Sequence, residues 1–280
     1  MTTAPSLRLG RIPWINCYPI YGAIDRGLSG SRCSCVTGTA SELNDLLAAG
    51  ALDVSVVSAV EYARNAAAYQ LLPDLAICLR RPGAQRGIVL PPPDQGAGWE
   101  DQFSSRPRPE PAFSCWSCSA VTAGESDPTS PPRRAEAGDL ESLQGLPHDA
   151  VLVIGDAALM LGARHGYRER VDLGSEWKAW TGLPFVFAVW AARRDAQLGL
   201  VQQVHAGLIR SRAWGLEHLD ELARDAARGS GVTERVCRDY LDDLDYALSY
   251  RHLAGLTDFF RRLAQDGLVP DGSLSFITAA

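Results

Sequence analysis

The stretch Asp172–Ala191, DLGSEWKAWTGLPFVFAVWA, divides into a polar half and an apolar half. Aromatic and β-branched residues dominate from Leu183 onward, which is typical of a buried strand. Pro184 stands near the start of that strand, where a missing N–H costs little. Gly182 permits an unusual dihedral angle or close contact with a ligand. Two interpretations of the polar half are open: a loop that only leads into a core strand, or a segment that binds a ligand.

Strands and helices alternate on both sides of this stretch. Strands are predicted over Leu7–Ile12, Leu52–Ser58 and Val151–Ile154, the last of them buried and of the parallel type. Thr39–Glu42 fits a capping box, and the helix that it starts is predicted to stop at Gly50. Further helices are predicted before Gly27 and over Val60–Asn65, Asp139–Leu146, Ala157–Ala163, Asp195–Arg228 (two amphipathic helices), Thr233–Leu248 and Leu253–Gln265. The inward positions of the two amphipathic helices are Leu198, Val201, Val204, Leu208, Leu216, Leu219, Leu222 and Ala226. This alternation predicts an α/β fold.

Composition and charge argue against several classes of protein. The chain has 280 residues, enough for two domains, and its 46% hydrophobic and 21% charged residues are typical of a globular protein. Its net charge of −6 provides no basic surplus for binding nucleic acid. No apolar run approaches the ~18–20 residues that span a bilayer, and residues 1–10 lack the order of a signal peptide. We therefore expect a cytoplasmic protein with neither a nucleic-acid nor a membrane partner.

The seven cysteines and five histidines form no pattern typical of a metal site or a catalytic triad. Cys115 and Cys118 have the CxxC spacing, but they lack a second pair or a nearby histidine. We interpret this spacing as chance, and the sequence predicts no metal site.

The stretch Leu79–Arg134 differs from the rest of the chain. It holds ten of the 17 prolines and shows neither the two-residue period of a strand nor the 3.6-residue period of a helix. Its only strand-like run is Ile88–Leu90. By composition it is a loop or insert with little regular structure, yet so long a loop is improbable within a domain.

Four segments carry a resemblance to a known family. They are LRLGRIPWINCYPIY (residues 7–21), LAAGALDVSVVSAVEYAR (47–64) followed by LLPD, DAVLVIGDAAL (149–159), and the opening stretch. In this order they resemble the menaquinone biosynthesis (MqnA/MqnD) family of the futalosine route, and within it the chorismate dehydratase (MqnA) branch. The resemblance covers residues 7–77 and about 138–280.

The resemblance implies a two-lobed, type II periplasmic-binding-protein-like fold with a ligand cleft between its lobes. We expect residues 1–88 and 190–280 to form lobe 1, and residues 89–189 to form lobe 2. Over Leu79–Arg134 the family's serine-bearing strand and Ser/Thr-rich loop have no counterpart. This composition, rich in Pro, Arg, Ser and Cys, is what a GC-rich coding sequence yields when it is read off-frame. We therefore infer a paired frameshift, in the gene or in its recorded sequence. A genuine divergent insert is the alternative.

The activity that the resemblance implies is loss of water from chorismate, which gives 3-[(1-carboxyvinyl)oxy]benzoate. This step has no redox change, so we expect no cofactor, and chorismate is the expected small-molecule partner. An enzyme must remove a ring proton, ease the departure of hydroxide and bind two carboxylates. The family is thought to use the substrate's own carboxylate as the base.

Candidate site residues follow from the same motifs. Asn16 matches the family's asparagine after the first strand and is the predicted catalytic residue. The residues predicted to bind substrate are Trp14, Tyr18, Ser58, Asp156, Thr181 and Gly182. Each also has a structural interpretation: Asn16 in loop hydrogen bonds, Ser58 and Asp156 as helix caps, and the aromatic residues in the core.

Three other functions stay open. The sister branch, which acts on cyclic dehypoxanthinyl futalosine, shares the fold. A non-catalytic small-molecule-binding protein would share it too, because a fold does not determine function. An inactive lyase would result if Leu79–Arg134 disrupts the second lobe. The sequence leaves the oligomeric state open.

Overall fold

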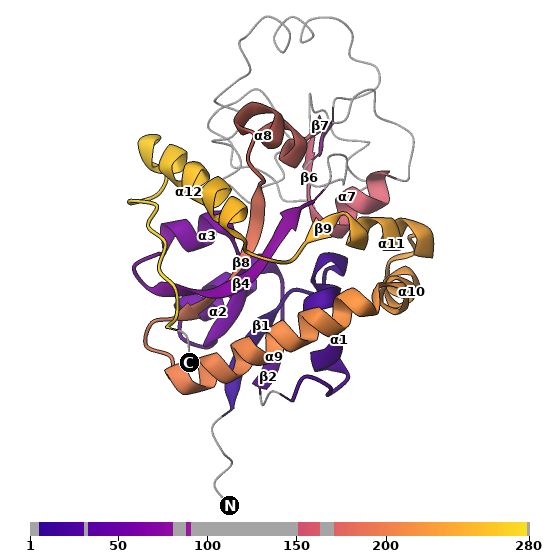
Figure 1. The fold of residues 1–280 in the computed structure, drawn as a ribbon, viewed down its shortest axis with the longest axis horizontal. Helices are drawn as coiled ribbons and strands as arrows, with labels where there is room; N and C mark the ends of the chain where they lie inside the picture. The colour runs from indigo at the N-terminus through magenta and orange to yellow at the C-terminus, as the bar shows by residue number, and fades with distance from the viewer. Residues whose placement is uncertain (1–5, 31–32, 81–87, 91–150, 163–170, 279–280) are drawn as a thin grey trace, which may run out of the picture.

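A computed structural model describes residues 6–30, 33–80, 88–90, 151–162 and 171–278. The predictions for Asp139–Leu146, for Cys115 and Cys118, and for most of Leu79–Arg134 concern residues outside these ranges. The described elements form one larger and one smaller β-sheet with helices around them (Figure 1).

The larger sheet contains six of the described strands in the order β2-β1-β3-β8-β4-β9. These strands are β1 (Leu7–Arg11), β2 (Cys33–Thr37), β3 (Val54–Ser58), β4 (Tyr69–Leu79), β8 (Val186–Arg193) and β9 (Leu244–Asp245). β1 is parallel to β2 and β3, whereas β8 is antiparallel to β3 and β4. The strand predicted from Leu183 is therefore central, as expected from its apolar sequence, and begins at Val186.

The smaller sheet has the order β6-β5-β7. Its strands are β5 (Ile88–Leu90), β6 (Val151–Val153) and β7 (Val171–Asp172). β5 confirms the strand-like run predicted inside the anomalous stretch. The prediction of a parallel-type strand at Val151–Ile154 was wrong, because β6 pairs antiparallel with β5. Apolar sequence predicts burial, but it does not determine the direction of the neighbouring strand.

Helices cover the larger sheet on both sides. α1 (Tyr18–Asp25) and α9 (Leu198–Glu217) lie side by side, while α3 (Ala59–Arg64) and α12 (Tyr250–Gln265) lie across the sheet from α9 (Figure 1). The other helices are η1 (Ile15–Cys17, a 3₁₀ turn), α2 (Ala40–Ala48), α7 (Gly155–Gly162), α8 (Leu173–Thr181), α10 (Leu219–Ser230) and α11 (Glu234–Asp242). The capping box predicted at Thr39 and Glu42 is present at the start of α2. No helix of the described residues is long and apolar enough to cross a membrane.

The core joins these layers through apolar packing and one buried hydrogen-bond chain. Trp190 on β8 donates to the Tyr21 hydroxyl at 3.0 Å, and that hydroxyl donates to the Gly10 carbonyl at 2.8 Å. Both rings are fully buried, so their polar groups need such partners. These two hydrogen bonds connect α1 to β1 and β8.

The polar half of the opening stretch is a helix rather than a loop. Asp172 caps α8 by accepting the Ser175 N–H at 2.9 Å, and Gly182 ends it in the left-handed conformation with φ 72°. Trp177 is buried in edge-to-face contact with Trp180, Phe185 and Phe259. The sequence W-x-x-W thus places two rings on the same side of one helix.

Two details of the helical C-terminal half differ from the prediction. The helix predicted over Thr233–Leu248 ends at Asp242, because the chain then pairs as β9 with β4. Leu198 and Leu216, predicted to face inward, are exposed near the two ends of α9. The other six predicted inward positions are buried.

Candidate active site

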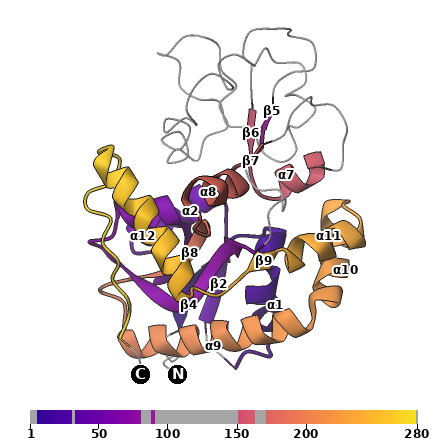
Figure 2. The same ribbon diagram turned by 45° about the horizontal axis from the view of Figure 1, so that its top comes forward.

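One edge of the larger sheet collects the ends of several strands. β1 and β3 run in the same direction, so their carboxyl ends lie at the same edge. Ser58, the last residue of β3, is opposite Ala188 near the start of β8, and Cys78 near the end of β4 is opposite Val186. We call this the cleft edge, after the ligand cleft that the resemblance implies. The smaller sheet and α7 lie beyond it (Figure 2). In open α/β sheets, ligands bind outside the carboxyl ends of the strands.

Asn16 lies at the cleft edge, directly after β1. It is the middle residue of η1, a turn closed by the Cys17 N–H and the Trp14 carbonyl at 2.9 Å. The side chain is only 6% exposed, and its Oδ1 atom has no hydrogen-bond partner among the described atoms. Leaving a buried polar atom unpaired costs about 1–3 kcal/mol. A ligand that donates a hydrogen bond to this amide would remove that cost.

The start of α7 contacts the same turn from the smaller sheet. Both carboxylate oxygens of Asp156 accept the Ile15 N–H, at 3.0 and 3.2 Å. Gly155 lies so close to the Trp14 ring that a Cβ there would be 3.2 Å from it. Trp14, Asn16 and Asp156, predicted from distant parts of the sequence, therefore lie together.

Tyr18 begins α1 next to this group and is partly buried. Burial raises the pKa of its phenol, and the negative charge of Asp156 raises that pKa further. The phenol therefore stays protonated at neutral pH and can donate a hydrogen bond to an anionic ligand.

Ser58 is at the cleft edge as the N-cap of α3. Its hydroxyl oxygen accepts the Glu61 N–H at 3.1 Å. This is the capping role that the sequence left open, and it uses one acceptor site of the oxygen. The hydroxyl hydrogen can still donate to a carboxylate.

Thr181 and Gly182 precede β8, but the polar groups proposed for binding are bonded within the end of α8. The Thr181 hydroxyl donates to the Trp177 carbonyl at 2.8 Å and accepts the Leu183 N–H at 3.1 Å. The Gly182 N–H donates to the Lys178 carbonyl at 2.9 Å. These contacts end the helix, so a ligand would compete with them for the same groups.

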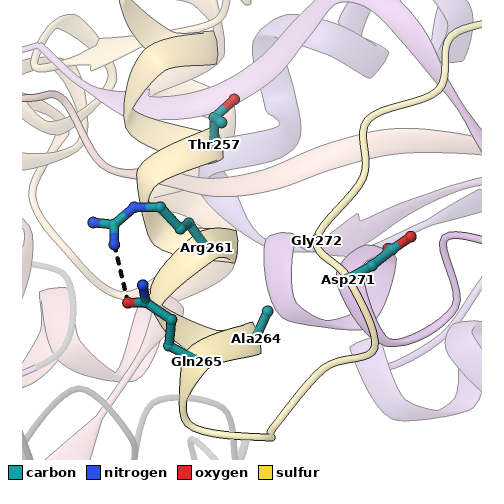
Figure 3. Close-up of a pocket in the computed structure, with 6 residues that line it drawn as sticks. All are labelled: Thr257, Arg261, Ala264, Gln265, Asp271 and Gly272. Carbon is teal, nitrogen blue, oxygen red and sulfur yellow. Dashed lines mark hydrogen bonds between the residues drawn. The ribbon is translucent and has the colours of Figure 1, made fainter.

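A surface pocket of about 440 Å³ lies elsewhere, between α12 and the segment that follows it. Its lining residues are Thr257, Arg261, Ala264, Gln265, Asp271 and Gly272 (Figure 3). Arg261 donates to the side chain of Gln265 at 2.9 Å and also pairs with Asp258. The predicted site residues are not among those that line this pocket. Across the parts of the chain that the structure describes, no three His, Cys, Asp or Glu side chains form a metal-binding group.

The sequence predicts Asn16 and Asp156 as site residues, but it does not predict that Asp156 contacts the turn that carries Asn16. The contact between Asp156 and the Ile15 N–H spans 141 residues, and neither motif predicts the other as its partner. Gly155 beside an aspartate was the available signal, because a glycine before a helix often allows close contact with another segment.

Comparison with known proteins identifies the family. The chain matches the sequence model of a family described as menaquinone biosynthesis over residues 7–91 and 129–265. The unmatched gap between these two segments lies inside Leu79–Arg134.

Two curated proteins of Thermus thermophilus are similar in sequence. Its chorismate dehydratase is 30% identical over 247 residues, which cover 80% of this chain and 84% of the relative. Its 1,4-dihydroxy-6-naphtoate synthase is 40% identical, but over only 58 residues, or 21% of each chain.

Solved structures share the fold at low sequence identity. A protein of Archaeoglobus fulgidus has a TM-score of 0.70 at 15% identity, covering 94% of this chain and 98% of its own. The periplasmic aliphatic sulphonate binding protein of Escherichia coli has a TM-score of 0.61 at 12% identity, with 99% and 94% covered. A Candida albicans protein described as having the generic periplasmic binding protein fold scores 0.63 at 10% identity, with 95% and 92% covered. These structures confirm the predicted periplasmic-binding-protein-like fold. The match to the family model over residues 7–91 and 129–265, together with the similarity to the curated chorismate dehydratase, shows that this chain belongs to the menaquinone biosynthesis family.

Proposed function

We propose that the protein is a chorismate dehydratase that forms 3-[(1-carboxyvinyl)oxy]benzoate and water in the cytoplasm. The observation that carries this proposal is the 30% identity to a curated chorismate dehydratase over 84% of that relative. The match to the sister enzyme extends over 58 residues only, which favours the dehydratase.

The geometry at the cleft edge supports Asn16 as the catalytic residue. Its buried amide has an unpartnered oxygen, so the site is prepared for a ligand that supplies a donor. Chorismate has a ring hydroxyl that can donate and carboxylates that can accept from the amide N–H groups. We assign Asn16 the task of holding the leaving hydroxyl and the substrate's own carboxylate in a reactive arrangement.

The chemistry needs little from the protein beyond this orientation. A proton leaves one ring carbon and hydroxide leaves its neighbour, and the electrons of the broken C–H bond complete the aromatic ring. No electron is gained or lost overall, so the reaction needs no redox cofactor. Ser58 and Tyr18 are proposed to donate hydrogen bonds to the substrate carboxylates, and Trp14 to form a wall of the cleft.

Purified protein incubated with chorismate tests the proposal by chromatography and mass spectrometry of the product. We expect an ion that has lost one water and a new aromatic absorbance. The sister substrate, cyclic dehypoxanthinyl futalosine, is assayed in parallel. Turnover of that substrate alone would contradict the proposal, and binding of chorismate without turnover would favour a non-catalytic binding protein or an inactive lyase.

Asn16→Ala tests the assigned residue. We expect kcat to fall about 10²-fold or more while KM changes little, because the lost contacts act mainly in the transition state. Asn44→Ala is the matched control, since Asn44 on α2 also has a buried, unpartnered Oδ1 atom but lies within a helix rather than at the cleft edge. Equal kcat values for Asn16→Ala and the unaltered protein would reduce Asn16 to a loop residue.

A further inference from the structure

In the helical turn that carries Asn16, the first backbone N–H donates a hydrogen bond to a residue from a distant part of the chain. Trp14, the residue before η1, makes no side-chain capping bond to it. The first N–H groups of a helical turn have no partner within the turn. For η1, the Ile15 N–H is accepted instead by Asp156 of α7, at 3.0 and 3.2 Å. A turn at the end of the larger sheet is thus capped by a residue that follows the smaller sheet.

A second contact brings the same two segments together. Gly155 has φ 64°, a conformation that disfavours other residues, and its Cα faces the Trp14 ring. An added Cβ would be 3.2–3.3 Å from three ring atoms. Gly155 of α7 therefore packs against the Trp14 ring, and the next residue, Asp156, accepts the Ile15 N–H.

We propose that Asp156 is a positioning residue that joins the two lobes and orients Asn16 when the cleft is closed. This inference rests on the proposed function of the same site. Two-lobed proteins open and close by hinge motion around their ligands. Opening would move Asp156 away from the Ile15 N–H, and the residue next to Ile15 is Asn16. The catalytic amide is then fully oriented only in the closed state, which couples substrate enclosure to turnover.

Asp156→Ala and Asp156→Asn distinguish this role from substrate binding. The alanine variant loses the acceptor, so we expect kcat to fall about 10- to 100-fold with a smaller change in KM, since a small misplacement of a reacting group is costly. The asparagine variant retains an oxygen that can accept the Ile15 N–H, and it should recover most of that turnover. Asp172→Ala is the matched control, because Asp172 also accepts a backbone N–H, but within its own helix α8.

Hydrogen exchange gives a readout that does not depend on activity. In substrate-free protein, which occupies the closed state for part of the time, a peptide containing Ile15 should exchange faster in Asp156→Ala than in the unaltered protein, Asp156→Asn or Asp172→Ala. Unchanged exchange, or faster exchange with unchanged kcat, would overturn the inference. If the unaltered protein does not convert chorismate, the proposed function fails, and the exchange result alone then decides whether Asp156 caps the turn.

Discussion

His252 makes a buried contact whose strength should depend on pH. It lies in the first turn of α12, where its Nδ1 atom accepts the Ser249 N–H at 3.2 Å in a capping box. Burial lowers its pKa, and the nearby carboxylate of Asp245 acts in the opposite direction. The unfolded chain therefore takes up a proton before the folded protein does. The stabilising contribution of neutral His252 is present above the unfolded pKa of about 6.5 and is lost as the pH falls through the lower folded pKa.

His252→Gln should weaken this pH dependence, because glutamine can serve in a capping box but does not titrate. The measurement is the free energy of unfolding in urea at several values between about pH 8 and 5. We expect similar stability at the alkaline end and a smaller loss on acidification than in the unaltered protein. His205, whose pKa is also lowered by burial, is present in both proteins and cancels in the comparison. If the free energy of unfolding depended on pH equally in His252→Gln and in the unaltered protein, His252 would be ruled out as the titrating group.

The positions of individual candidate site residues were predictable only where a local motif identified them. Asn16 follows a recognisable strand, so its position at the sheet edge could be predicted from the sequence. Its unpartnered oxygen could not, because the absence of a partner depends on every neighbour in the folded protein. The hydrogen bonds of Thr181 were likewise hidden, since they depend on α8 ending at that residue.

α9 offers a test of helix packing with two glycines on one helix. An added Cβ on Gly215 would lie 2.1 Å from the Pro19 carbonyl oxygen of α1, whereas one on Gly199 would meet nothing within 4 Å. We expect Gly215→Ala to destabilise the fold by about 1–3 kcal/mol, because α1 and α9 must move apart. Gly199→Ala should stabilise it by up to ~1 kcal/mol, because alanine is the better helix former. Denaturant unfolding of both variants measures the change in the free energy of unfolding. A lower free energy of unfolding in both variants would contradict the packing argument.

Helices and strands were predictable as far as local sequence determined them. The strongly amphipathic α10 and α12 were predicted, as was the capping box of α2. The end of α11 was not, because the next residues pair with β4, and long-range pairing overrides helix propensity. α8 was left open between a loop and a binding segment, although its two tryptophans have helical spacing.

For the whole chain, the central question is whether Leu79–Arg134 is translated as written. The family match stops at residue 91 and resumes at 129, which agrees with a local break in the resemblance. Peptide mapping by mass spectrometry checks the sequence directly. If the sequence of this stretch is off-frame only in its record, we expect the measured mass of the purified protein to differ from the mass calculated from the sequence. The peptides that differ should all lie within this stretch. Peptides that match the recorded sequence throughout would establish a divergent insert.

The neighbouring positions of β4 and β8 have a further consequence for how this protein tolerates change. Cys78 and Val186 are paired across these antiparallel strands, so the chain leaves the larger sheet and returns to it at nearly the same point. Gly174 of α8 also lies against the side chain of Leu79. A deletion of residues 81–171, with a short flexible linker from Arg80 to Asp172, should therefore leave a scaffold that unfolds cooperatively, as circular dichroism in urea can show. Loss of cooperative unfolding would mean that the scaffold needs residues 81–171 to fold. If the scaffold survives, a change confined to residues 81–171 can abolish catalysis without preventing the rest of the chain from folding.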